Sequence, residues 1–163
     1  MGTETDLPQT VARALIASYE RFRDRIHTLL EPLSTEEVWR KPYPYGNTVG
    51  HLLLHLIGNL RYYIGAQMAG TGYVRNRPQE FSDPEARPKA EILQDLDDAV
   101  ALVVKTLSAQ SAADWCAPYQ GAGAESIHDR FTMFMRSASH ADHHLGQIIY
   151  LCKQIELDRT GHP

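Results

Sequence analysis

Apolar side chains recur at alternating intervals of three and four residues along four stretches of the chain, and prolines separate these stretches. This spacing places the apolar side chains on one face of an α-helix. The first helix is expected between a cap at Asp6 or Thr10 and a stop at Pro32. Its apolar stripe comprises Leu15, Tyr19, Phe22, Ile26 and Leu29.

The other three stretches predict three more helices. The second is expected to begin after Asn47 or Thr48, and the fourth to run from about Glu125 to Glu156. The apolar stripes are Val49, Leu53, Leu56, Leu60 and Tyr63 in the second helix, Leu93, Leu96, Val100, Val103 and Leu107 in the third, and Phe131, Phe134, Ala138, Ala141, Leu145, Ile148 and Cys152 in the fourth. Four helices that each bury one apolar stripe predict an all-α four-helix bundle.

The connection from about Ala69 to Arg87 is some 19 residues long and is rich in glycine, proline and arginine. This length exceeds what two antiparallel neighbours in a bundle need. At about 3.3 Å per residue, the segment can return along a helix of roughly 30 Å, which leaves the second and third helices parallel in an up-down-down-up order. The other two long loops carry Trp39 and Trp115, and we expect them to form short helical turns at the bundle ends.

The composition changes this picture little, but it excludes some partners. With 163 residues and 43% hydrophobic content, the chain suits one domain over residues 1–163. A formal net charge of −4, without a dense run of Lys or Arg, argues against a nucleic acid as partner. No apolar run reaches the roughly 18 residues of a membrane-spanning helix, and the N-terminal residues lack the basic and apolar blocks of a signal peptide. We therefore expect a cytoplasmic protein without a membrane partner.

Two histidine pairs with a spacing of four residues supply the candidate chemistry. His140 and His144 lie one turn apart on the fourth helix and point in the same direction. The second helix carries the other pair, His51 and His55. Because His55, His140 and His144 flank apolar stripes, packing of the two helices would bring three imidazoles to one divalent metal ion. The alternative interpretation is that these histidines are only polar residues at the border of a buried face.

The third ligand is expected to be His55 rather than His51. His55 lies deeper in the second helix and adjoins Gly58 and Asn59, which allow a neighbouring element to approach closely. His51 lies near the helix start, where it would line the mouth of the pocket and contact the substrate or support the ligands. Three protein ligands leave a coordination position open for water or substrate.

Three arginines are candidates to hold an anionic substrate near this site. Arg61, Arg75 and Arg77 follow His55 in sequence, and a guanidinium can bind a carboxylate through two parallel hydrogen bonds. The competing interpretation is that each arginine forms an ordinary surface or loop ion pair. Glu80 is expected to order the connection by pairing with an arginine.

Two segments carry most of this chemistry, and they read HLIGNLRYYIGAQMAGTGYVRNRPQEF (residues 55–81) and RSASHADHHLGQIIYLCK (residues 136–153). With these segments the chain resembles the DinB-like metalloprotein superfamily, in the branch with His-x-x-Gly-Asn and Arg-Asn-Arg-x-x-Glu-Phe blocks. The resemblance implies an up-down-down-up four-helix bundle with His55, His140 and His144 as metal ligands. It also implies a divalent metal, commonly zinc or nickel, that activates a thiol, since the known activities include low-molecular-weight-thiol transferases and a thiol-dependent isomerase. Asn59 of the Gly-Asn pair becomes a further candidate for substrate contact.

The sequence leaves two functional classes open. One is a metal-dependent enzyme of the thiol-transferase type, acting on a small molecule such as a low-molecular-weight thiol. The other is a non-catalytic metal-binding or dimerisation module, in which the metal stabilises the bundle and the chain forms a homodimer. A closed site with four ligands would favour the second class, and three ligands beside a pocket would favour the first.

Overall fold

The structure is a computed structural model that describes residues 6–82 and 85–161, and these residues form helices without a β-strand. The long helices are α1 (Leu7–Leu30), α3 (Val49–Leu60), α6 (Lys89–Ser108) and α8 (Arg130–Thr160). The short elements are α2 (Thr35–Trp39), the π-helical segment η1 (Arg61–Ala66), α4 (Gln67–Ala69), α5 (Gln79–Ser82) and α7 (Ala112–Trp115). The predicted all-α class is confirmed.

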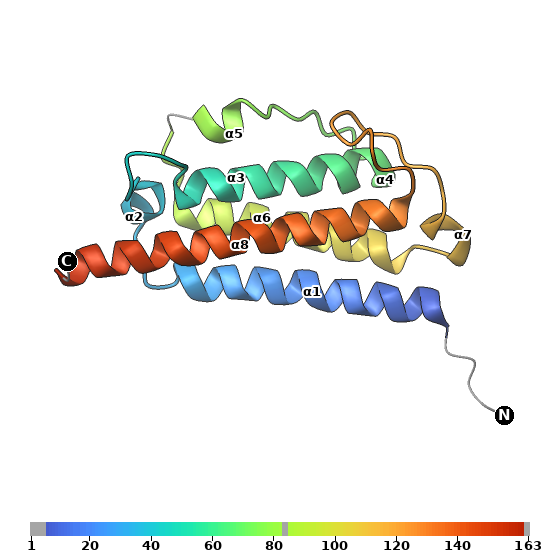
Figure 1. The fold of residues 1–163 in the computed structure, drawn as a ribbon, viewed down its shortest axis with the longest axis horizontal. Helices are drawn as coiled ribbons and strands as arrows, with labels where there is room; N and C mark the ends of the chain where they lie inside the picture. Colours follow the sequence, from blue (N-terminus) through green and yellow to red (C-terminus); the bar gives the residue numbers. More distant parts are fainter. Residues whose placement is uncertain (1–5, 83–84, 162–163) are drawn as a thin grey trace.

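The long helices form a bundle in which α1 and α8 run in one direction and α3 and α6 in the other (Figure 1). α1 packs against α6 and α8, and α3 packs against the same two helices. After α4 the chain returns along α3, carries α5 against α3 and then enters α6 (Figure 1). This crossover is what allows α3 and α6 to be parallel.

The buried core contains most of the expected stripe residues. The stripe expected for the second helix is buried throughout, at Val49, Leu53, Leu56, Leu60 and Tyr63. In α1, Leu30 takes the buried position expected for Leu29, and in α6 Ile92 lies deeper than Leu93. These shifts occur because neighbouring positions share the border of a helical face. Within the described residues, no helix combines the length and the apolar character needed to cross a bilayer.

The helix α8 begins at Arg130, later than the expected start near Glu125. Asp129 caps this helix through its side chain, which accepts a hydrogen bond of 2.7 Å from a first-turn backbone N–H. The residues before it are held by an isolated antiparallel bridge between Pro118 and Asp129. Phe131 consequently lies in the first turn and is 41% exposed, so its expected place in the buried stripe is wrong.

Short helices close both ends of the bundle, as the loops with Trp39 and Trp115 predicted (Figure 1). A serine directly precedes both α2 and α7, and its side chain accepts a backbone hydrogen bond from the first turn. Trp39 donates from Nε1 to the Arg87 carbonyl at 2.8 Å. Trp115 is buried against Phe134, with ring centroids 5.5 Å apart. The two tryptophans therefore join the end helices to the bundle.

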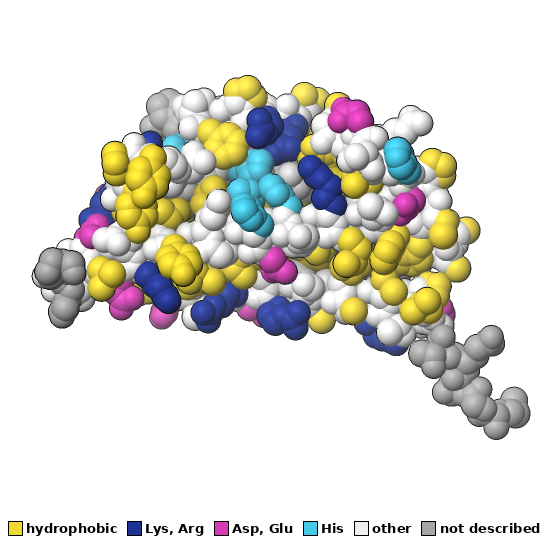
Figure 2. Space-filling view, in the orientation of Figure 1, with side chains coloured by type: hydrophobic (Ala, Val, Ile, Leu, Met, Phe, Trp, Pro, Cys, Tyr) yellow, Lys and Arg dark blue, Asp and Glu magenta, His cyan; other side chains and the backbone are white. Residues whose placement is uncertain are grey.

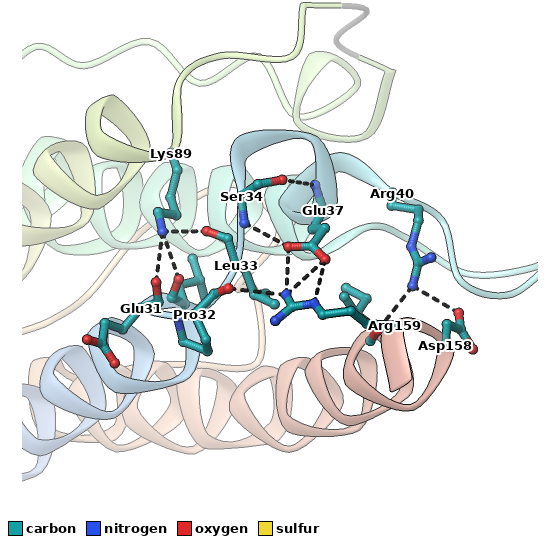
Figure 3. A network of polar contacts seen from close by, with 11 residues as sticks. Glu31, Pro32, Leu33, Ser34, Glu37, Arg40, Lys89, Asp158 and Arg159 are labelled. Carbon is teal, nitrogen blue, oxygen red and sulfur yellow. Dashed lines mark hydrogen bonds and ion pairs between the residues drawn. The ribbon is translucent and has the colours of Figure 1, made fainter. Parts of the chain in front are cut away.

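Lys89, the first residue of α6, connects that helix to the end of α1 (Figure 3). Its ammonium group donates to the carbonyls of Leu30 at 2.9 Å and Glu31 at 3.2 Å, and also to that of Leu33. The last carbonyls of an α-helix have no donor within the helix. One cation thus donates to three carbonyls at and just after the end of α1.

The end of α8 joins the same region, because the helix continues to Thr160 and passes the expected end near Glu156. Arg159 donates from Nη2 to both carboxylate oxygens of Glu37 in α2, at 2.8 Å each (Figure 3). Gly161, with φ of 67°, then ends the helix in the left-handed conformation.

Lys89→Met is expected to lower the free energy of unfolding by about 1–3 kcal/mol, because the substitution leaves several carbonyls without their charged donor. Urea unfolding measures the change. Lys153→Met, at an exposed position of α8, is the control and should change stability by less than about 0.5 kcal/mol. Equal effects of the two substitutions would contradict the role given to Lys89.

Candidate metal centre

Three histidines from two helices converge on one face of the bundle. Figure 2 shows a patch of His side chains there, between hydrophobic side chains on one side and Lys and Arg side chains on the other. His55 of α3 and His140 and His144 of α8 each offer a ring nitrogen, and these nitrogens lie within 4.8 Å of one another. The Nε2 atoms of His55 and His140 are 3.0 Å apart. The four-residue spacing therefore directs both imidazoles of α8 toward α3, as expected.

A buried ion pair orients His55. The Glu80 carboxylate lies 2.8 Å from Nδ1 of His55, and Arg75 donates to the same carboxylate from Nε at 2.6 Å and from Nη2 at 2.8 Å. This confirms the expected pairing of Glu80 with an arginine. Because an ionised carboxylate only accepts hydrogen bonds, Nδ1 of His55 donates to Glu80, and Nε2 lies on the opposite side of the ring. That Nε2 faces His140.

Gly58 makes room for the Glu80 carboxylate. A Cβ atom at Gly58 would collide with Oε1 of Glu80, so the close approach expected at this glycine is confirmed. Burial raises the pKa of Glu80, but its hydrogen bonds with His55 and Arg75 outweigh burial and leave the pKa below its ordinary value. The carboxylate is therefore ionised at neutral pH.

The other two histidines are held neutral by their surroundings. Burial lowers the pKa of His140 from 6.5 to about 3, and the neighbouring His144, His55 and Arg136 add to this effect. Burial likewise lowers the pKa of His144. Neutral imidazole is the form that binds metals, and a set of three suits zinc, nickel, copper or iron. The donor set thus fits a divalent metal.

Gln147 orients His144 from one turn further along α8. Its Oε1 lies 2.7 Å from Nδ1 of His144 and accepts a hydrogen bond from it. This contact leaves Nε2 of His144 available on the side of the other two histidines. Gln147 also borders an aromatic cavity of about 520 Å³, where Tyr43 and Tyr45 stack with ring centroids 5.5 Å apart.

A second cavity, of about 660 Å³, opens beside His55 and His140. Asn59, Arg75 and Arg77, which are three of the candidates for substrate contact, line its wall. The structure therefore brings these three candidates together with two of the site histidines.

The cavity wall continues into η1, where each backbone hydrogen bond spans one residue more than in an α-helix. Tyr62 and Tyr63 both line the cavity from this segment, and their rings are 5.0 Å apart. The hydroxyl of Tyr63 donates to the Gly123 carbonyl at 3.3 Å, which joins the wall to the loop before α8.

The structure places the two remaining candidates, His51 and Arg61, elsewhere. The His51 ring packs edge-on against Trp39, with centroids 5.3 Å apart, and its Nδ1 lies 3.0 Å from the Thr48 hydroxyl. Arg61 forms an ion pair of 2.7 Å with Asp95 and lines a smaller hollow of about 280 Å³. Neither side chain lines the 660 Å³ cavity, and their expected contact with a substrate stays a prediction.

Arg136, which no sequence motif above singles out, lies in the wall of the 660 Å³ cavity one turn before His140. Its guanidinium carbon is 5.0 Å from the centroid of the Tyr63 ring. The four-residue spacing from His140 is the signal that could have identified it. No helical spacing predicts the contact of Glu80 with His55, because 25 residues separate the two.

The chain is a helical bundle with three converging imidazoles beside a cavity, which is the kind of arrangement from which four-helix proteins build metal sites. The chain belongs to the DinB superfamily, whose family model matches residues 18–148. This confirms the family resemblance seen in the sequence. No protein of curated function matches the chain.

Among solved structures, a conserved protein from Enterococcus faecalis is similar to this chain. The TM-score is 0.72, and the likeness covers 88% of this chain and 96% of that chain at 17% sequence identity. At this level of identity the likeness concerns the fold alone.

Gly58→Ala is expected to lower the free energy of unfolding by about 1–3 kcal/mol, because the added methyl group overpacks against Glu80 and disturbs its ion pair with Arg75. Urea unfolding of the metal-free protein measures this effect. Gly146→Ala in α8 is the matched control, since nothing lies within 4 Å of the Cβ position there. It should raise stability by roughly 0.5–1 kcal/mol, the helix preference of Ala over Gly. A stabilising Gly58→Ala would contradict the close approach of Glu80.

The metal-free protein is expected to lose stability as the pH falls from about 7 to about 5. The pKa of His140 drops from 6.5 to about 3 in the folded chain, and that of His144 is also lowered. In this interval the unfolded chain takes up protons that the folded chain does not, so the free energy of unfolding decreases with decreasing pH. Urea unfolding at several pH values gives the slope.

His140→Gln should reduce this slope by the amount that one histidine contributes to it. The contribution of Glu80 falls in a different interval, because its pKa is lowered from 4.5 and its stabilising effect is lost only below about that pH. If His140→Gln leaves the slope unchanged, the burial of a neutral His140 is not its cause.

Proposed function

We propose that the chain is a divalent-metal-dependent enzyme of the low-molecular-weight-thiol transferase type, with zinc or nickel held by His55, His140 and His144. The observation that carries this proposal is the convergence of three ring nitrogens within 4.8 Å of one another beside a cavity of about 660 Å³. Cavities of this size hold small molecules. The proposed substrates are therefore a small thiol and a small electrophile.

The number of candidate ligands supports chemistry over a purely structural metal. Structural zinc sites commonly use four protein ligands, whereas catalytic sites use three and keep one position open. Among residues 6–82 and 85–161, the group contains three members. Glu80 is held by His55 and Arg75, so it is not available as a fourth ligand.

A divalent metal, when bound, lowers the pKa of a thiol and polarises an electrophile. The chain's own residues prepare the site for it. The lowered pKa values of His140 and His144 keep both imidazoles unprotonated at neutral pH. Glu80 and Gln147 each accept a hydrogen bond from Nδ1 of a histidine, which directs its Nε2 to the centre of the group. Arg77 adds positive charge to the cavity wall, which suits an anionic substrate.

The test uses protein loaded with Co²⁺, a spectroscopic substitute for zinc, and 2-mercaptoethanol as the thiol. A thiolate bound to cobalt gives a charge-transfer band in the near ultraviolet, and we expect this band on addition of the thiol. His55→Ala, His140→Ala and His144→Ala should each abolish the band and weaken metal binding by more than about 100-fold, which exceeds the effect of residues that only support a ligand. Competition with a chromophoric chelator measures the affinity.

His51→Ala is the control, since its imidazole contacts Thr48 and Trp39, and it should keep both metal and band. Full metal binding by His55→Ala would overturn the assignment of ligands. Metal binding that stabilises the protein without any thiolate band would favour the non-catalytic metal-binding module.

A further inference from the structure

Arg136 carries a charge that has no counter-ion within residues 6–82 and 85–161. It lines the 660 Å³ cavity, and its guanidinium lies over the Tyr63 ring at 5.0 Å. It makes no hydrogen bond or ion pair with any residue in the described ranges, and its Nη1 atom is buried without a partner. Charged groups withdrawn from water are normally paired. A ligand in the cavity could supply the missing partner.

The other two arginines of the cavity differ from Arg136 in this respect. Arg75 donates to both carboxylate oxygens of Glu80, which neutralises its charge. Arg77 is exposed to water, and its guanidinium lies over the Phe81 ring at 5.7 Å. Arg136 is therefore the guanidinium best prepared for an anion.

The composition of the wall also favours an anion. Arg75, Arg77 and Arg136 line the cavity, and no Asp or Glu among the described residues does. This local excess of positive charge contrasts with the net charge of −4 for the chain. Asn59 is 3% exposed and lies in the same wall, and its Oδ1 atom lacks a hydrogen-bond partner within the described residues. The cavity thus suits an anion that also offers a hydrogen-bond donor.

We propose that the thiol substrate carries a carboxylate, that Arg136 binds this carboxylate, and that Asn59 accepts a hydrogen bond from an N–H or O–H of the same molecule. The inference rests on the proposed function, because it takes the three histidines as the place where the sulfur binds. Side chains at positions i and i+4 of a helix have Cβ atoms about 5–6 Å apart, and Arg136 and His140 have this spacing. This spacing suits a short thiol, in which only a few bonds separate the carboxylate from the sulfur.

The experiment compares two thiols that differ in one group, 3-mercaptopropionate and 2-mercaptoethanol. Titration of each into the cobalt-loaded protein, followed by the thiolate band, gives two affinities. The wild-type protein is expected to bind 3-mercaptopropionate about 10- to 100-fold more tightly, the range of a charged hydrogen bond. In Arg136→Gln this preference should fall to within about 3-fold, with little change for 2-mercaptoethanol.

Two further variants separate recognition from folding. Arg136→Lys keeps the charge but loses the planar pair of donors, so it should show an intermediate preference. Arg130→Gln is the matched control, because Arg130 lies on the same helix and contacts Gln110 and Asp114 outside the cavity. It should keep the full preference for 3-mercaptopropionate.

A second measurement distinguishes failure of this inference from failure of the proposed function. The same two thiols are titrated into metal-free protein, and the side-chain amide of Asn59 is followed by NMR. Saturable shifts with 3-mercaptopropionate alone, lost in Arg136→Gln, would support the carboxylate site even if cobalt gave no thiolate band. A thiolate band with equal affinity for both thiols would leave the proposed function intact and overturn the inference. The N–H groups of Arg136 would then be hydrogen-bonded to water and not to a carboxylate. Binding of neither thiol in either form of the protein would overturn both.

Discussion

The geometry of the site depends on the carboxylate of Glu80. This group is 6% exposed, and it accepts hydrogen bonds from Arg75 and from Nδ1 of His55. A buried charge persists only where it is paired and hydrogen-bonded, so the carboxylate holds the crossover connection against α3. Gly58 supplies the space that this contact requires. One ionised side chain thus determines how the connection packs and which nitrogen His55 presents.

Ordinary helix packing supplies the rest of the arrangement. His140 and His144 project from one face of α8, and the contact of α8 with α3 brings them to His55. Beyond α3, the π-helical segment η1 allows Tyr62 and Tyr63 to line the same cavity. Widened turns of this kind are frequent at functional sites. The bundle therefore positions both the imidazoles and the wall beside them.

Periodicity and loop length were enough to predict the four long helices and the crossover, because each depends on spacing within one segment. The proximity of the three histidines could be predicted because each histidine lies beside an apolar stripe, and such stripes pack against one another in a bundle. Individual side-chain contacts between distant segments were harder to predict from the sequence. His51 turns toward Trp39, and Arg61 pairs with Asp95, 34 residues further on. Such pairings arise from tertiary packing, and the spacing of residues within one helix does not predict them. The exposure of Phe131 has a similar origin, since the loop before α8 delays the start of that helix.

The crossover connection contributes residues both to the wall of the 660 Å³ cavity and to the support of His55. Tyr73 and Arg77 lie in the wall of the 660 Å³ cavity, and Glu80 holds His55 a few residues later. A molecule in the cavity and a metal on His55 would therefore both favour the conformation in which this segment is packed on α3. Two ligands that favour the same conformation raise each other's affinity by the same factor. Metal and substrate binding would then be thermodynamically linked through the backbone of the connection, even for parts of the substrate that never touch the metal.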